Sequence, residues 1–126
     1  MTKPHHVPDG WPTLAPRITV PEPEKLVGFI KHVFGATGSY QPERPAELRI
    51  GESLLMVSGT GGLEARSAFL YVYVEDTDAT YRRALDSEAT SVEDPRDLHY
   101  GDRRAVISDA WGNLWQIATH SGRFTP

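Results

Sequence analysis

The stretches ITVPEPEKLVGFIKHVFGAT (residues 18–37) and VYVEDTDATYRRALDSEAT (residues 72–90) decide the fold, because each has the pattern of a strand followed by an amphipathic helix. ELRIGESLLMVS (residues 47–58) follows the first and RAVISDAWGNLWQIAT (residues 104–119) follows the second, and each contains two short strand patterns around a turn. The order strand, helix, strands therefore occurs twice, as in an internal repeat. A chance likeness between two amphipathic units is the alternative explanation.

Capping and turn residues give the expected bounds of these elements. Pro23 at the first helical position and Gly35 beyond the last predict the limits of the first helix, and Asp76 offers a capping oxygen to the second. Gly51 followed by Glu52 suits a two-residue hairpin turn. The expected strands cover residues 14–20, 46–50, 53–58, 68–74, 104–108 and 114–119, and the segment through Pro95, His99 and Tyr100 is expected to be a loop.

Composition narrows the class of protein. The 126 residues, with 39% hydrophobic and 24% charged side chains, fit one globular domain. The chain has no cysteine, which excludes disulfides, thiolate metal sites and a cysteine nucleophile, and which favours the cytoplasm. A net charge of −4 argues against nucleic acid as a partner, and no apolar run reaches the length of a membrane span, so no membrane partner is expected.

The second half of the chain carries a family resemblance. VEDTDATYRRAL (residues 74–85) and HYGDRRAVISDAWGNLWQIATH (residues 99–120) resemble the C-terminal module of the glyoxalase/bleomycin resistance protein/dioxygenase (vicinal oxygen chelate) superfamily, especially its PhnB-like branch. The usual turn in that family is Asp-Pro-x-Gly-Asn before the last strand. This chain keeps Asp109, Gly112 and Asn113 and has Ala110 where proline is common.

The resemblance implies the architecture. It predicts an α+β fold in which two βαβββ modules form a half-open curved sheet, with modules paired (swapped) between the two chains of a homodimer. The single domain then covers residues 14–120, with module one at 14–62 and module two at 66–120. Residues 1–13 are expected to be a flexible proline-rich tail, and residues 121–126 a second tail.

The resemblance also gives the positions of the family's metal ligands. In metal-using members, histidine or glutamate side chains stand at four places that fall here on Ala15, Met56, Phe69 and Gln116. Alanine and phenylalanine offer no donor atom, methionine a weak thioether and glutamine one neutral carbonyl, whereas such ions need carboxylate or imidazole ligands. The sequence therefore predicts no metal and no other cofactor.

Alternation along the strands predicts which side chains line the cleft. The four former metal positions, which include Met56, Phe69 and Gln116, define the side of each strand that faces the cleft. Arg17 lies on that side, and so do Tyr71 and Tyr73, which follow Phe69 on one strand and complete a row of three rings. The rings could cover a flat conjugated ligand by stacking. Alternatively, they fill the barrel or a dimer seam.

Loop residues complete the predicted ligand-binding set. His99 and Tyr100, together with Trp111 in the last turn, are expected at the rim of the cleft. His99 is also the candidate general base, with Asp97 and Asp102 near it only in sequence. His120 is expected to face solvent at the end of the last strand.

These observations lead to one function and two alternatives. The chain is predicted to bind an aromatic natural product or antibiotic without a metal and without turnover, and so to confer resistance by sequestering it. The first alternative is a metal-independent isomerase or lyase of the same superfamily, which uses His99, Tyr71 or Gln116 in proton transfer. The second is an interaction module whose aromatic side chains serve only the dimer seam.

Overall fold

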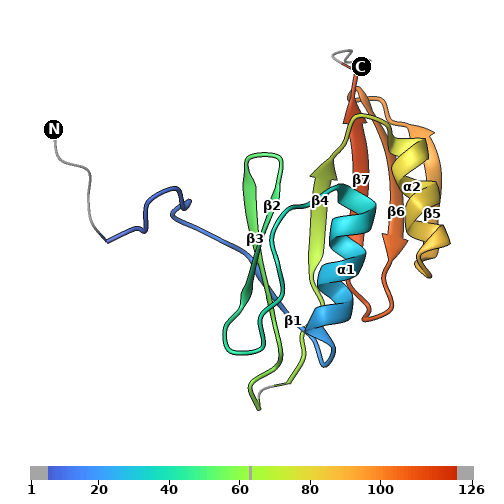
Figure 1. Ribbon diagram of the computed structural model, residues 1–126. Helices are drawn as coiled ribbons and strands as arrows, with labels where there is room; N and C mark the ends of the chain where they lie inside the picture. Colours follow the sequence, from blue (N-terminus) through green and yellow to red (C-terminus); the bar gives the residue numbers. More distant parts are fainter. Residues whose placement is uncertain (1–5, 63, 122–126) are drawn as a thin grey trace, which may run out of the picture. The chain divides into compact units, whose positions relative to one another are not determined.

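The computed structural model describes residues 6–62 and 64–121 and divides into two units (Figure 1). The first unit contains residues 1–31 and 35–65, and the second contains residues 32–34 and 66–126. Each unit has its own sheet.

The first unit holds a three-stranded mixed sheet in the order β1-β3-β2. β1 runs parallel to β3, and β2 pairs with β3 in antiparallel fashion. Its elements in chain order are β1 (Arg17–Thr19), α1 (Pro23–Phe34), β2 (Ala46–Ile50) and β3 (Ser53–Ser58), except that residues 32–34 at the end of α1 belong to the second unit. Gly51, with φ 58°, opens the two-residue turn between β2 and β3, so the predicted hairpin is confirmed with its bounds.

Local signals in the sequence fix the two ends of α1. Pro23 occupies the first turn, where a missing N–H leaves no hydrogen bond unmade. Gly35 adopts the left-handed conformation at φ 69°, and its N–H donates to the carbonyl of Lys31. Both predicted limits are confirmed.

The first unit differs from the prediction at its N-terminal end. The first strand begins at Arg17 rather than at residue 14, because Pro16 has no N–H for a ladder and Leu14 is exposed. In addition, a strand between α1 and β2 is reduced to an isolated bridge between Thr37 and Arg49. The predicted tail, within its described residues, is tied to this unit, since Nη2 of Arg49 donates to the carbonyl of Gly10 at 2.9 Å.

The second unit holds a four-stranded mixed sheet in the order β4-β7-β6-β5. β4 runs parallel to β7, and β7, β6 and β5 are antiparallel neighbours. The elements are β4 (Phe69–Tyr73), α2 (Thr77–Asp86), β5 (Thr90–Asp97), β6 (Asp102–Ser108) and β7 (Leu114–His120). The fold is thus the predicted α+β arrangement of two βαβββ-like modules, and α2 lies over β6 and β5 in Figure 1.

The predicted loop through Pro95 is wrong, because residues Thr90–Asp97 form β5. This strand is polar and sits at the edge of the sheet, where the prediction had no hydrophobic alternation to detect. Its register with β6 shifts twice, between Ser91 and Glu93 and between Glu93 and Arg96. Such irregularities, together with an edge position, allow proline inside a strand.

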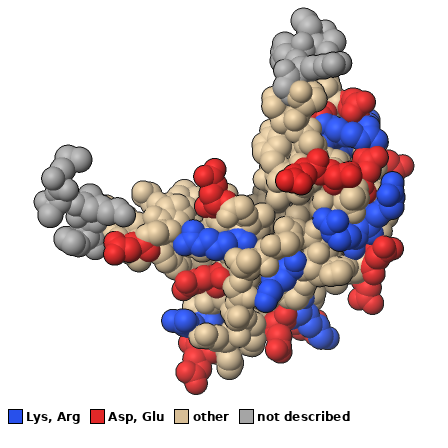
Figure 2. Space-filling model, turned by 45° about the horizontal axis from the view of Figure 1, so that its top comes forward, with Lys and Arg blue, Asp and Glu red and all other residues tan. Residues whose placement is uncertain are grey.

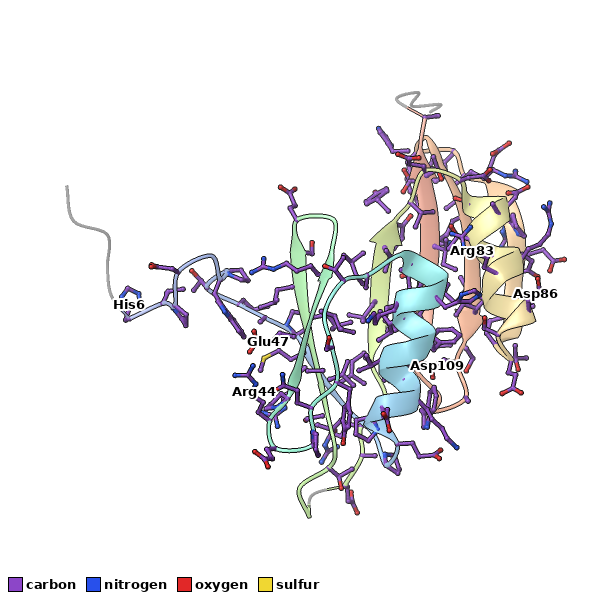
Figure 3. All side chains as sticks on the ribbon, viewed as in Figure 1. His6, Arg44, Glu47, Arg83, Asp86 and Asp109 are labelled. Carbon is purple, nitrogen blue, oxygen red and sulfur yellow. The ribbon has the colours of Figure 1, made fainter. Side chains whose placement is uncertain are left out.

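The core of the second unit lies between its sheet and its helices. Trp115 is fully buried on β7, and its ring centroid lies 4.9 Å from that of Phe34 in the last turn of α1. Arg83, labelled on α2 in Figure 3, donates from Nε and Nη2 to the carbonyl of Val33. The end of α1 is therefore held to α2 by a cation that satisfies a terminal carbonyl.

The turn between β6 and β7 is organised by Asp109 (Figure 3). Its buried carboxylate accepts hydrogen bonds from the backbone N–H groups of Trp111 and Asn113, from Nδ2 of Asn113 and from Nε1 of Trp115. Oδ1 of Asn113 in turn accepts from the N–H of Ala68. The residues that carry the family resemblance in this turn therefore have structural roles.

The surface shows mixed charges. In Figure 2, acidic and basic side chains are interspersed over the visible face and do not gather into a field of one sign. None of the helices formed by the described residues is long and apolar enough to cross a bilayer.

Candidate functional site

Three exposed rings stand in a row on β4 of the second unit. Phe69, Tyr71 and Tyr73 are 66%, 38% and 60% exposed. The rings of Tyr71 and Tyr73 have centroids 5.3 Å apart and are tilted by 54°. Because side chains alternate along a strand, they lie on the face opposite to Trp115, whose ring contacts that of Phe34. The structure thus agrees with the prediction that the rings and Trp115 lie on opposite faces of this sheet.

Asp102 gathers polar side chains on that same face. It is 3% exposed, and its Oδ2 accepts hydrogen bonds from the hydroxyls of Tyr71 at 2.6 Å and Tyr73 at 3.0 Å. Its Oδ1 lies 2.8 Å from Nδ1 of His120. The antiparallel register of β6 and β7 places Asp102 directly opposite His120. We call these four residues the Asp102 cluster.

The cluster shifts the pKa values of its own members. Burial raises the pKa of Asp102, but the hydrogen bonds from Tyr71, His120 and Tyr73 outweigh it, and the pKa lies below its ordinary value. Burial and the hydrogen bond to Asp102 raise the pKa of the Tyr71 hydroxyl. The hydrogen bond to Asp102 also raises the pKa of Tyr73. At neutral pH the cluster therefore holds a carboxylate and two protonated phenols.

A second charged group is centred on Glu93 of β5. Nη2 of Arg104 lies 3.0 Å from Oε1 of Glu93, and Arg96 binds the other oxygen, Oε2. The hydrogen bonds from Arg96 and Arg104 lower the pKa of Glu93 despite partial burial. Nη1 of Arg104 also lies 3.4 Å from the hydroxyl of Tyr100, which brings one predicted rim residue beside this group.

His99 does not have the carboxylate partners that were considered for it. Its ring makes an edge contact with Tyr100 at a centroid distance of 5.4 Å. Asp97 instead binds Arg103, and Asp102 accepts from His120. The histidine that does contact a carboxylate is His120, which pairs with Asp102. His120 is exposed as expected, with 57% of its side chain open to solvent, but it also contacts Asp102, which was not expected.

The other predicted residues of the second unit lie in two places. Gln116 is half-buried on β7, opposite Tyr71 on one side and Val106 on the other. Trp111 is half-buried in the turn that Asp109 organises.

The predicted residues of the first unit lie on β1 and β3. Nε of Arg17 donates to Oγ of Ser58 at 2.9 Å. Met56 is half-buried on β3 and pairs in register with Arg17. Ala15 precedes β1 and has no place in its ladder.

The four former metal positions do not form a ligand set. In the second unit, Phe69 pairs with Leu114, whereas Gln116 pairs with Tyr71, so the two positions are not cross-strand neighbours. Neither Phe69 in the second unit nor Ala15 in the first has a side-chain donor atom. Over residues 6–62 and 64–121, moreover, the structure has no group of three or more histidine or acidic side chains arranged to hold an ion. The residues present do not fit the family's metal.

A polar hollow lies at the start of α2. Its lining includes Glu75, Asp76, Arg82 and Thr119. Arg103, which also lines it, is held by Asp78 through Nε at 2.7 Å and by Asp97 through Nη1 at 3.2 Å. Because Arg103 is already paired with two carboxylates of this hollow, the aromatic face is the better candidate site.

Sequence reasoning missed Asp102 and His120, although a signal for them was present. The turn at Asp109 was recognised, and the strands that flank it pair from Ser108 with Leu114 outward. Counting the same number of residues from each side of the turn reaches Asp102 and His120. Alternation then puts Asp102 on the face of the rings, where a carboxylate would attract their hydroxyls.

Comparison with known proteins agrees with this fold. The sequence profile described as the Glyoxalase/Bleomycin resistance protein/Dioxygenase superfamily matches residues 5–117. The chain belongs to this superfamily. An uncharacterized protein of Mycobacterium bovis is 27% identical over 124 residues, with 84% of this chain and 82% of that protein covered.

Solved structures show the same arrangement. The crystal structure of TioX from Micromonospora sp. ML1 is similar with a TM-score of 0.73 and 25% identity, over 85% of this chain and 97% of that one. A superfamily enzyme from Burkholderia phytofirmans PsJN has a TM-score of 0.72 over 84% of this chain and 96% of that one. It is 17% identical and shows the fold alone.

Proposed function

We propose that this superfamily member, which we assign to the PhnB-like branch, is a metal-independent binding protein that sequesters an aromatic natural product or antibiotic. The row of exposed rings on β4 carries the proposal. Burying aromatic surface away from water lowers the free energy, so a row of three exposed rings on one strand favours a role in binding.

The surroundings of the rings support a ligand site. Ligand pockets combine apolar surface with a few placed polar groups. Here two of the three rings belong to the Asp102 cluster, Gln116 lies on the neighbouring strand, and Tyr100 lies beside Arg104. Stacked aromatic pairs add about 0.5–1.5 kcal/mol beyond the area that they bury.

A thermal-shift screen of planar polyketides, enediynes and glycopeptides tests the proposal. A ligand at a hundred times its dissociation constant stabilises the fold by about 2.7 kcal/mol, which gives a clear shift. The shift is expected to disappear in Phe69→Ala and to persist in Val92→Ala, which truncates another exposed apolar side chain, on β5. Divalent metal ions are included as a control, and they should give no shift because the chain lacks the family's metal ligands. A shift that is equal in both variants would contradict the proposed site.

The second candidate function is a metal-independent isomerase or lyase. It is favoured by the hydrogen bond between His120 and Asp102, because a carboxylate on one ring nitrogen orients the other as a proton acceptor. Chromatography of each stabilising compound after incubation would detect conversion. Conversion lost in His120→Gln, with the thermal shift kept, would favour the enzyme over the binding protein.

We further propose a cytoplasmic homodimer, with modules paired between chains, as the working form. In that form the rings could instead belong to the seam between subunits. Sedimentation velocity of Phe69→Ala separates these roles. A dimer that dissociates in this variant, with no compound ever stabilising the parent protein, would favour the seam.

A further inference from the structure

The direction of each hydrogen bond in the Asp102 cluster follows from the charge of its centre. An ionised carboxylate only accepts hydrogen bonds, so each of its partners must donate. The hydroxyl hydrogens of Tyr71 and Tyr73 therefore point to Oδ2, and the hydrogen on Nδ1 of His120 points to Oδ1. Three polar side chains on one face thus turn their hydrogens inward.

What these side chains present outward is the complement. Each phenol oxygen has two lone pairs, although that of Tyr71 also contacts the side chain of Tyr100, and an imidazole of His120 that donates from Nδ1 alone has an acceptor at Nε2. The ring faces of Phe69 and Tyr73 are also negative in their centres. The exposed fractions of these rings and of His120 leave this array open to a ligand.

Arg104 lies on the same face as the rings, since it pairs with Ala118, which pairs with Tyr73, but a carboxylate holds its guanidinium. Nε and Nη2 of Arg104 both donate to Oε1 of Glu93, and Arg96 binds the other oxygen of the same carboxylate. The negative charge of Asp102, in contrast, is surrounded by neutral donors when His120 is uncharged. A negative centre behind acceptor atoms favours a cation and disfavours an anion.

We propose that the Asp102 cluster and the rings of β4 select an aromatic ligand that carries an ammonium or other N–H donor group. The ligand stacks on Phe69 and Tyr73 and donates to the oxygens of Tyr71 and Tyr73 or to Nε2 of His120. This inference rests on the proposed function and adds the chemical class of the ligand. It also assigns Asp102 as a positioning residue, which acts through the tyrosines.

Three naphthalene probes of matched size test the inference on the full chain at pH 7.5. These are 2-naphthylmethylammonium, 2-naphthalenemethanol and 2-naphthoate, and the readout is the dissociation constant from NMR shifts of the tyrosine rings. The cation is expected to bind at least about tenfold more tightly than the anion, a difference of about 1.4 kcal/mol. The neutral probe should fall between them.

Variants locate the source of the preference. Asp102→Asn should reduce the preference for the cation several-fold, whereas Asp86→Asn, on α2, should keep it. Tyr73→Phe keeps the ring and removes the acceptor oxygen, so it should weaken the binding of the cationic probe more than the binding of the alcohol. If Asp102→Asn does not fold, Tyr73→Phe and His120→Gln still decide the matter, because both side chains are more than half exposed.

The outcomes separate this inference from the proposed function. Anion binding that equals or exceeds cation binding, lost in Phe69→Ala, overturns the ligand class and leaves the aromatic site in place. A cation preference that is unchanged in Tyr73→Phe and His120→Gln overturns the role of the cluster. Failure of all three probes and of the wider screen to bind overturns both.

Discussion

Two buried aspartates, Asp109 and Asp102, stand at opposite ends of the hairpin that β6 and β7 form. Both are almost inaccessible to water, and both accept several hydrogen bonds. The donors to Asp109 are backbone N–H groups and buried side chains within six residues of it. The donors to Asp102 are exposed side chains from strands β4 and β7, distant in sequence.

This difference separates a structural carboxylate from a candidate functional one. Asp109 closes a turn, and the groups that donate to it are backbone N–H groups and the buried side chains of Asn113 and Trp115. Asp102 orients tyrosines and a histidine that keep free lone pairs on an exposed face. The burial of a carboxylate therefore says little about its role, whereas the exposure of its partners is informative.

The largest effect is expected at the closed end of the hairpin. In Asp109→Asn, an amide group would face several buried donors, which should lower the free energy of unfolding by about 3 kcal/mol. Urea denaturation followed by tryptophan fluorescence measures the change. Asp86→Asn, at the exposed end of α2, is the control and should stay within about 0.5 kcal/mol.

A smaller loss is expected at the open end. Asp102→Asn should destabilise the fold by about 1–2 kcal/mol, because the tyrosine hydroxyls and His120 can turn to water. The same denaturation experiment gives the value. A loss as large as that of Asp109→Asn would show that Asp102 is also mainly structural and would weaken the comparison.

The dependence of stability on pH distinguishes Asp102 in a different way. The folded state holds the pKa of Asp102 below its unfolded value, so its contribution is fully present above about pH 5. That contribution is lost as the pH falls through the folded pKa, because protons then bind the unfolded state more readily. Unfolding free energies between pH 6 and pH 3 should therefore fall less steeply in Asp102→Asn than in the parent chain.

The smallest effect is expected for one hydroxyl of the cluster. Tyr73→Phe removes a hydrogen bond of 3.0 Å from a ring that is 60% exposed, and the free energy of unfolding should change by no more than about 0.5 kcal/mol. Thermal unfolding of the two proteins side by side detects it. A loss above 1 kcal/mol would mean that the cluster holds the sheet together and would count against a binding role.

Much of the fold was predictable, because it depends on local signals. Pro23 and Gly35 limited α1, Gly51 set the hairpin, and alternation on β4 assigned the rings to one face. Strand β5 was missed because its side chains are polar and its register is broken around Glu93. The periodicity of apolar residues along the sequence gives no signal for such a polar edge strand.

The candidate site was predictable only in its apolar part. The row of rings follows from one strand, whereas the Asp102 cluster needs the register of three strands. His99 was favoured because two aspartates lie near it in sequence, but the sheet brings Asp102 to His120 instead. Contacts between strands that are far apart in the chain were the missing information.

The broken register of β5 also has a consequence for how this protein behaves at high concentration. An extended chain that tried to add to this margin of the sheet would meet a bulged backbone, a proline without an N–H, and the charges of Glu93 and Arg96. Such features block strand-by-strand aggregation. The segment that was hardest to recognise in the sequence thus disfavours polymerisation at this one edge of the sheet.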